Sequence, residues 1–126
     1  MRDFRELKVW QKAHEVTLEV YRATKTFPRE EQFGLTAQVR RSAESVAASI
    51  AEGCGRDGDP EFARFLQIAM GSASETEYHL LLARDLELLH ATDYDPLAHK
   101  VEEVKKMLTA LIRKLRADRR KLKADG

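Results

Sequence analysis

Apolar residues recur at intervals of three and four in four successive stretches of the chain, and short polar segments separate these stretches. This period places the apolar side chains on one face of an α-helix. The pattern predicts four helices, at about residues 5–26, 31–52, 60–91 and 96–122. The connections are too short to cross the length of a bundle. We therefore predict an all-α fold, an antiparallel up-down-up-down four-helix bundle that forms a single domain over residues 1–126.

Proline and glycine mark the predicted helix boundaries. Phe27-Pro28 ends the first helix, because proline lacks a backbone donor and disfavours helical geometry in the residue before it. Asp59-Pro60 and Asp95-Pro96 each place an N-cap residue before a proline at the first helical position, which predicts that helices start there. The glycines of the loop at residues 53–58 are expected to adopt positive φ.

The first and third helices each carry one feature that predicts packing. On the first helix, the apolar stripe is expected to contain Leu7, Trp10, His14, Thr17 and Tyr21, widened by Ala13, Leu18 and Val20. Gly71 lies in the middle of the third helix, where glycine costs ~1 kcal/mol relative to alanine. A close helix crossing at Gly71 would explain why the glycine is tolerated.

The second helix is thin, because alanine and serine occupy most positions between Val39 and Ile50. Small side chains let neighbouring backbones approach, so this helix is expected at the centre of the bundle. The fourth helix carries a heptad ladder at Leu97, Val101, Val104, Leu108, Leu111 and Leu115, which is expected to be buried.

Charge is balanced in total but divided along the chain. The sequence has 22 Lys and Arg against 21 Asp and Glu. Residues 59–95 carry two basic and eight acidic side chains, a net charge of −6, whereas residues 96–126 carry ten basic and four acidic, a net charge of +6. A single cysteine, Cys54, excludes an internal disulfide and favours a cytoplasmic location. The apolar runs are much shorter than the ~20 residues of a membrane-spanning helix, so no membrane association is expected.

Roughly residues 4–90 resemble a known family. The segment SIAEGCGR, with Arg40 and Arg41 before it and EFARFLQIAMGSASETE after it, resembles the signature of the four-helix-bundle proteins encoded in intervening sequences of bacterial 23S ribosomal RNA genes. The opening LKVWQKAHEVTLEVYRATKTFPREEQFGL is similar to the first helix and turn of that family. Relatives include the accessory proteins of diversity-generating retroelements, which form five-subunit barrels and bind a reverse transcriptase and nucleic acid. The resemblance implies a bundle fold and a homopentamer, with RNA, DNA or a protein as candidate partners.

Three patterns point toward enzyme chemistry, and each has a plainer interpretation. Residues 53–58 spell G-x-G-x-x-G, but the dinucleotide fingerprint requires a preceding strand, and here a helix precedes it. Glu87 and His90 have the Glu-x-x-His spacing of di-iron bundles, without the second copy that such sites require. Cys54, expected in a flexible loop, has no histidine within a few residues to activate it. We therefore predict no catalytic, cofactor or metal site, with a metal-dependent bundle enzyme as the alternative.

The end of the fourth helix is the candidate functional surface. In an up-down bundle this end lies beside the start of the first helix and the 53–59 loop. The candidate nucleic-acid-binding residues are Arg113, Lys114, Arg116, Arg119, Arg120, Lys121 and Lys123. Fivefold symmetry would multiply these cations into a basic rim that binds RNA or DNA electrostatically. A solvated helix end, whose cations complement the helix dipole, is the alternative.

Arg40, Arg41 and Glu52 are candidates for a structural or interface role. The family resemblance favours pairing of these residues across helices or subunits, and plain surface charge is the alternative. Taken with the basic end, the sequence favours a non-enzymatic homo-oligomeric scaffold. A purely structural or protein-recruiting oligomer remains as a further alternative.

Overall fold

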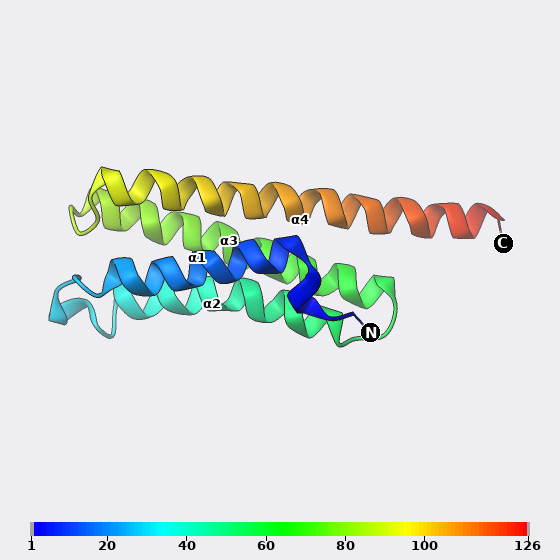
Figure 1. Cartoon of the computed structure of the whole chain (residues 1–126), viewed down its shortest axis with the longest axis horizontal. Coiled ribbons are helices and arrows are strands. Elements are labelled where there is room, and N and C mark those ends of the chain that lie inside the picture. Colours follow the sequence, from blue (N-terminus) through cyan, green and yellow to red (C-terminus); the bar gives the residue numbers. More distant parts are fainter. Residues whose placement is uncertain (1, 126) are drawn as a thin grey trace.

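Four long antiparallel helices form a bundle, as predicted, in the computed structural model, which describes residues 2–125 and the side chains of residues 2–124 (Figure 1). The helices are α1 (Lys8–Thr24), α2 (Leu35–Cys54), α3 (Asp59–Asp85) and α4 (Ala91–Asp125). Short 3-10 helices, η1 (Phe4–Glu6) and η2 (Arg29–Glu31), precede α1 and α2. No strand occurs within residues 2–125. The up-down-up-down prediction is therefore confirmed, with α1 and α3 pointing the same way.

The second helix starts later than the predicted residue 31. Glu31 belongs to η2, and α2 begins at Leu35 after Gly34. The Glu31 carboxylate accepts a hydrogen bond from the Leu35 N–H at 3.2 Å. The acid therefore satisfies a free donor at the positive end of α2 from outside the helix, which is the role that its charge favours.

The boundary between α3 and α4 differs most from the prediction. α3 ends at Asp85, because Glu87 adopts a left-handed φ of 61° and the Leu88 N–H bonds to the Ala83 carbonyl at 2.9 Å, which closes the helix. α4 then begins at Ala91, so Pro96 lies inside it and is not a start signal. The missing N–H of Pro96 removes a single helical hydrogen bond close to the N-terminus of α4.

The start of α3 is nearly as predicted. Pro60 occupies the first turn, but the N-cap position belongs to Gly58, which has a φ of 79°. The Asp59 carboxylate accepts a hydrogen bond from the Arg2 guanidinium at 2.7 Å instead of capping the helix. The loop is also shorter than predicted, because Gly53 is a buried residue of α2, and Gly55 has a negative φ of −85°.

The core lies between the four helices and is formed by one face of each. On α1 the buried residues are Val9, Ala13, Val16, Thr17, Val20 and Thr24, so the predicted Trp10–Tyr21 stripe lies at the edge of the core. Leu18 is 43% exposed and Tyr21 is 36% exposed. On α4 the predicted ladder is buried except that Ile112 replaces Leu111, which is half-buried. A straight helix drifts from a strict heptad repeat, which accounts for the change of residue.

The close helix crossing occurs at Gly53 and not at Gly71. A Cβ atom placed on Gly53 would lie 2.8 Å from the Phe65 Cβ atom, whereas a Cβ atom on Gly71 would meet nothing within 4 Å. The prediction for Gly71 is therefore wrong within a single chain. The backbones of α2 and α3 approach closely at the end of α2, where glycine removes the side chain that would separate them.

Two buried hydrogen bonds tie α1 and α3 to the same level of α2. The Thr17 hydroxyl donates to the Ala43 carbonyl at 3.2 Å, and the Thr76 hydroxyl donates to the Ser42 hydroxyl at 2.9 Å. Both hydroxyls also bond to their own helix, so these buried polar groups are satisfied. Thr17 and Thr76 consequently lie at nearly the same height along the bundle.

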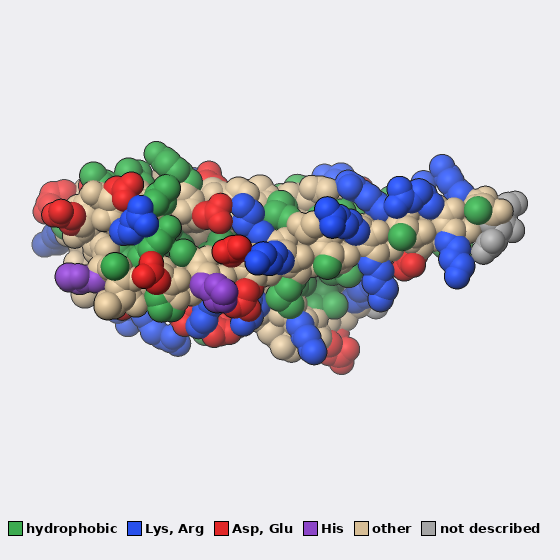
Figure 2. All heavy atoms as spheres, turned by 90° about the horizontal axis from the view of Figure 1, so that it is seen from above, with side chains coloured by type: hydrophobic (Ala, Val, Ile, Leu, Met, Phe, Trp, Pro, Cys, Tyr) green, Lys and Arg blue, Asp and Glu red, His purple; other side chains and the backbone are tan. Residues whose placement is uncertain are grey.

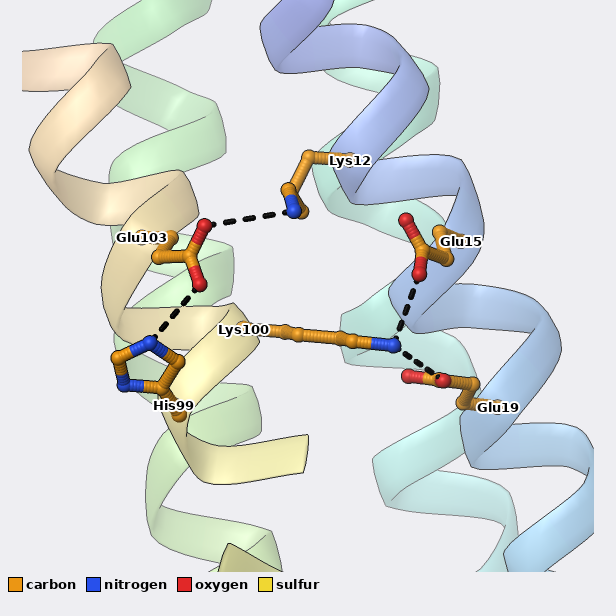
Figure 3. Close-up of polar contacts among 6 residues, drawn as sticks. All are labelled: Lys12, Glu15, Glu19, His99, Lys100 and Glu103. Carbon is orange, nitrogen blue, oxygen red and sulfur yellow. Dashed lines mark hydrogen bonds and ion pairs between the residues drawn. The ribbon is translucent and has the colours of Figure 1, made fainter. Parts of the chain in front are cut away.

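Polar side chains hold α1 against α4 (Figure 3). The Lys100 ammonium lies 2.8 Å from the Glu15 carboxylate and also bonds to Glu19, while Glu103 pairs with Lys12 at 3.3 Å and with His99 at 3.0 Å. The hydrogen bond from Lys100 holds the pKa of Glu15 below its usual value. The bonds to Glu15 and Glu19 raise the pKa of Lys100.

We expect Lys100→Gln to lower the free energy of unfolding at pH 7 by about 1 kcal/mol or less, since these ion pairs are at the surface and remain partly exposed. A carboxylate with a lowered pKa stabilises the fold above its unfolded pKa, and this contribution is lost as the pH falls through the lower folded pKa. The difference between variant and wild type should therefore disappear in acid. Urea unfolding at pH 7 and pH 3 measures it. Lys106→Gln, which breaks a pair within α4, is the control, and a difference that persists unchanged at pH 3 would exclude Glu15 as the source.

No helix within residues 2–125 combines the length and the apolar composition that crossing a bilayer demands.

Candidate nucleic-acid interface

α4 continues beyond the other three helices. Leu115 is its last buried residue, and every residue from Arg116 to Ala124 is exposed. In Figure 1 the C-terminal end of α4 projects past the loop between α2 and α3. The sequence favours helix there, because leucine, arginine, lysine and alanine are good helix formers and no glycine or proline occurs between Leu115 and Gly126.

The candidate cations all lie on this projecting segment or at its base, and all are exposed. They are Arg113, Lys114, Arg116, Arg119, Arg120, Lys121 and Lys123. Figure 2 shows Lys and Arg side chains gathered along the projecting end, whereas most acidic side chains in that view lie toward the opposite end of the molecule. Charge is therefore separated along the long axis of the protein.

These cations differ from the other arginines at the same end in having no carboxylate partner. Among the side chains of residues 2–124, none of the seven forms a salt bridge. By contrast, Arg2 pairs with Asp59 at 2.7 Å, Arg56 with Glu52 at 3.1 Å and Arg64 with Glu61 at 3.0 Å. The positive charge that remains available to a phosphate at this end therefore comes mainly from α4, with Lys8 at the start of α1 as a further exposed cation without a salt bridge among the described side chains.

Helical spacing separates the cations into two faces. Arg113, Arg116, Arg120 and Lys123 follow one another at intervals of three and four, so they share one face, with a rise of about 15 Å from first to last. Arg116 also lines, together with Arg119, Arg64 and the start of α3, an open pocket of about 270 Å³. The arginine-rich face therefore borders the start of α3.

The two phenylalanine rings of α3 at this end are covered and offer no stacking surface. Phe62 and Phe65 are buried in the bundle. The Arg2 guanidinium lies 4.2 Å from the centroid of the Phe62 ring, and those of Arg56 and Arg64 lie 5.1 and 4.5 Å from that of Phe65. Paired arginines thus cap the rings, and the chemistry left at the surface is electrostatic.

Arg40, Arg41 and Glu52 do not pair with one another within the chain. Arg40 donates to the Thr24 hydroxyl at 2.8 Å and lies over the Tyr21 ring, while Glu52 pairs with Arg56. Arg41 is exposed and has no salt-bridge partner among the described side chains. Pairing of Arg41 between subunits stays a prediction.

Cys54 is a core residue and not the flexible loop thiol that the sequence suggested. It ends α2 and is 1% exposed. Burial raises the pKa of its thiol, which disfavours the reactive thiolate. The G-x-G-x-x-G segment accordingly includes the last turn of α2, with Gly53 in a helix–helix contact.

Glu87 and His90 are not placed as the ligands of a di-iron bundle must be. Both lie in the connection between α3 and α4 and are exposed, whereas that motif requires two side chains projecting inward from one helix. Within the described residues, no group of three or more His, Cys, Asp or Glu side chains is placed to hold a metal ion.

The sequence identified the cations near the end of α4 but did not show which arginines at this end of the bundle are neutralised by carboxylates. Two of the pairs had a sequence signal, because Glu52 precedes Arg56 by four residues and Glu61 precedes Arg64 by three, the spacings at which helical side chains meet. The pair between Arg2 and Asp59 joins residues far apart in the chain and had no such signal.

Comparison with known proteins gives concordant results. The family model described as "23S rRNA-intervening sequence protein" matches residues 5–110. The chain is similar to a crystal structure of a protein of unknown function from the S23 ribosomal protein family of Bacteroides thetaiotaomicron, with 28% sequence identity and a TM-score of 0.77. That similarity covers 82% of this chain and 97% of the other. No match is found among curated proteins.

Proposed function

The chain belongs to the 23S rRNA-intervening sequence protein family, and from this membership we propose that it is a non-enzymatic homo-oligomeric scaffold that binds nucleic acid electrostatically. One observation carries the proposal: the projecting end of α4 and its base hold seven exposed cations without carboxylate partners among the described side chains. A free, buried thiol fits the reducing cytoplasm, where we place the protein.

The proposed ligand is the phosphate backbone of RNA or DNA. Arginine presents a planar fork of donors that matches phosphate oxygens, and four of the seven cations are arginines. The acidic residues of α3 from Glu75 onward lie toward the other end, and Glu77 pairs with Lys105 at 3.0 Å, so they do not form salt bridges with the candidate cations. Because the Phe62 and Phe65 rings at this end are buried and capped by arginines, binding should be weakly sequence-specific and sensitive to salt.

The proposed assembly is a homopentamer. The ring size comes from the resemblance to retroelement accessory proteins, and the opposite charges of residues 59–95 and 96–126 favour a contact between unlike faces. Such heterologous contacts close into rings. A ring would bring the basic ends of α4 together and raise the local positive charge.

Replacing Arg113, Arg116, Arg119 and Arg120 with glutamine should weaken binding at least about tenfold at ~50 mM salt and reduce the slope of log K against log salt by about 3. Each lost arginine removes one phosphate contact, and counterion release scales with the number of contacts. Fluorescence anisotropy with a single-stranded RNA and a DNA duplex, measured between ~50 and ~200 mM salt, tests this. If the wild type binds neither the RNA nor the DNA, the proposal is wrong.

A matched variant controls for the loss of charge. Arg5, Arg56, Arg64 and Arg84 each pair with a carboxylate, so replacing them with glutamine removes the same charge from the chain. We expect this second variant to retain most of the affinity and the salt dependence. If both variants lose affinity equally, overall net charge and not the end of α4 determines binding.

The assembly is tested independently of nucleic acid. Light scattering at micromolar concentration should give five times the mass of one chain, 14.4 kDa. A monomer would contradict the homo-oligomer, and a dimer or tetramer would contradict the ring size.

A further inference from the structure

The outer side of α3 carries apolar residues that the four-helix core leaves uncovered. Ile68 is 43% exposed, Tyr78 57% and Leu86 54%. Helical spacing places these residues on one side of α3. We call Ile68, Gly71, Tyr78 and Leu86, together with the half-buried Leu82, the α3 outer stripe. With an apolar inner face as well, α3 is apolar on two sides, which a helix at the corner of an isolated bundle does not require.

A second uncovered stripe lies on α1. Its members are Trp10, His14, Leu18 and Tyr21, at helical intervals of four, four and three, and we call them the α1 outer stripe. The rings of Trp10 and His14 stack with centroids 4.9 Å apart and planes inclined by 10°. α1 and α3 occupy diagonal corners, each packed against α2 and α4. The two stripes are therefore separate faces of the chain.

No contact within the described chain explains why residue 71 is a glycine. A Cβ atom there would meet no other atom within 4 Å, yet glycine in the middle of a helix is destabilising relative to alanine. A glycine in an exposed apolar stripe allows a second backbone or a flat ring to approach closely. The observation therefore points to a contact from outside the chain.

The two stripes lie at the same height along the bundle. Thr17 of α1 and Thr76 of α3 bond to neighbouring residues of α2, and the two helices run in the same direction. With equal rise per residue, Trp10–Tyr21 is level with residues 69–80, and Gly71 is level with the middle of the Trp10–His14 pair. Copies related by rotation about an axis parallel to the helices keep their heights, so the stripes of adjacent copies can meet.

Charges around the two stripes are complementary. Lys25, just beyond α1, is exposed and level with residue 84, near the exposed Glu87, whereas Asp85 already pairs with Arg84 at 3.0 Å. Glu75 lies within the α3 outer stripe, exposed and without a salt-bridge partner among the described side chains. Two α3 stripes facing each other would bring the Glu75 and Glu87 side chains of two copies onto one contact, whereas an α1 stripe opposite an α3 stripe places Lys25 at the level of Glu87.

From these observations we infer that the α3 outer stripe of one copy packs on the α1 outer stripe of the next, with the stacked Trp10–His14 pair seated over Gly71. The inference rests on the proposed homo-oligomer and names the surfaces that build it. Because the two surfaces differ, the contact is heterologous and continues around a closed ring.

The test adds one bulky charge to each stripe. Gly71→Arg and Leu18→Arg alter exposed helical positions, so circular dichroism should show both variants folded. Sedimentation velocity should show that each variant has fallen from the wild-type mass to a monomer, whereas Ala110→Arg, at an exposed position on α4, should keep the wild-type mass. If the wild type assembles and both stripe variants keep its mass, this inference is wrong while the homo-oligomer stands. If the wild type is itself a monomer, the proposed assembly fails first.

A mixture distinguishes the heterologous contact from a symmetric one. Each variant retains one unaltered stripe, so equal amounts of Gly71→Arg and Leu18→Arg should form a one-to-one dimer. A symmetric contact through α3 alone would let Leu18→Arg assemble by itself. Either that self-assembly or a mixture that stays monomeric would overturn the inference.

Discussion

Leu108→Asp is expected to unfold the chain or leave it molten. Leu108 is 0% exposed at the centre of the α4 ladder. An unpaired charge in such a site costs about 3 to 5 kcal/mol. The lost leucine contacts add about 2 to 5 kcal/mol, and a domain has only about 5 to 15 kcal/mol in total. Trp10 is half-buried and its ring packs against that of Phe4. Its near-UV circular dichroism signal should therefore be lost, even if the far-UV signal of the helices remains.

The same change on the same helix face should be harmless further along α4. Leu122 lies two heptads after Leu108 but is 71% exposed, because α4 has left the bundle by then. Leu122→Asp should change the free energy of unfolding by no more than ~0.5 kcal/mol. If Leu108→Asp unfolds cooperatively in urea, with a free energy of unfolding within ~1 kcal/mol of the wild-type value, then α4 is not essential to the core.

Periodicity predicted the number and direction of the helices because each helix buries a face with a regular repeat. It could not select the buried face of α1. The prediction was right for Ala13, Thr17 and Val20, which are buried. The larger residues Trp10 and Tyr21, however, drew it toward an adjacent stripe and away from Val9 and Val16, which are buried. When two stripes are apolar, the choice depends on the surfaces of α2 and α4, which sequence spacing does not contain.

The α3–α4 connection was hidden for a related reason. Leu86, Leu88 and Leu89 continue the apolar pattern through the turn, so the sequence has no polar break there. The break is a backbone event, the left-handed φ of Glu87, and it occurs without a glycine. At the candidate interface, the position of the cations followed from the topology. The sequence did not show which cations at this end lack a carboxylate partner, because pairs such as the one between Arg2 and Asp59 join residues far apart in the chain.

Gly53 and Gly71 illustrate what a glycine in a helix can mean. Both are helical, and the sequence favoured a close crossing at Gly71. The structure places the close contact at Gly53, where α2 meets Phe65, and leaves Gly71 in open space. Helix propensity treats both residues alike, because the difference lies in the neighbouring helix.

Gly53→Val should therefore lower the free energy of unfolding by about 3 kcal/mol, near the upper end of overpacking costs. The new Cβ atom would lie 2.8 Å from the Phe65 Cβ atom and 3.2 Å from the Phe62 ring. The Phe65 Cβ atom is fixed to its backbone, so α2 and α3 must separate along their contact. The matched control is Gly55→Val, because Gly55 has an ordinary φ of −85° and its Cβ atom would lie 3.5 Å from the Glu52 carbonyl. Urea unfolding should show a large shift in midpoint at unchanged slope for Gly53→Val and a small one for the control. Equal shifts would show that the loop backbone, and not the helix crossing, requires glycine.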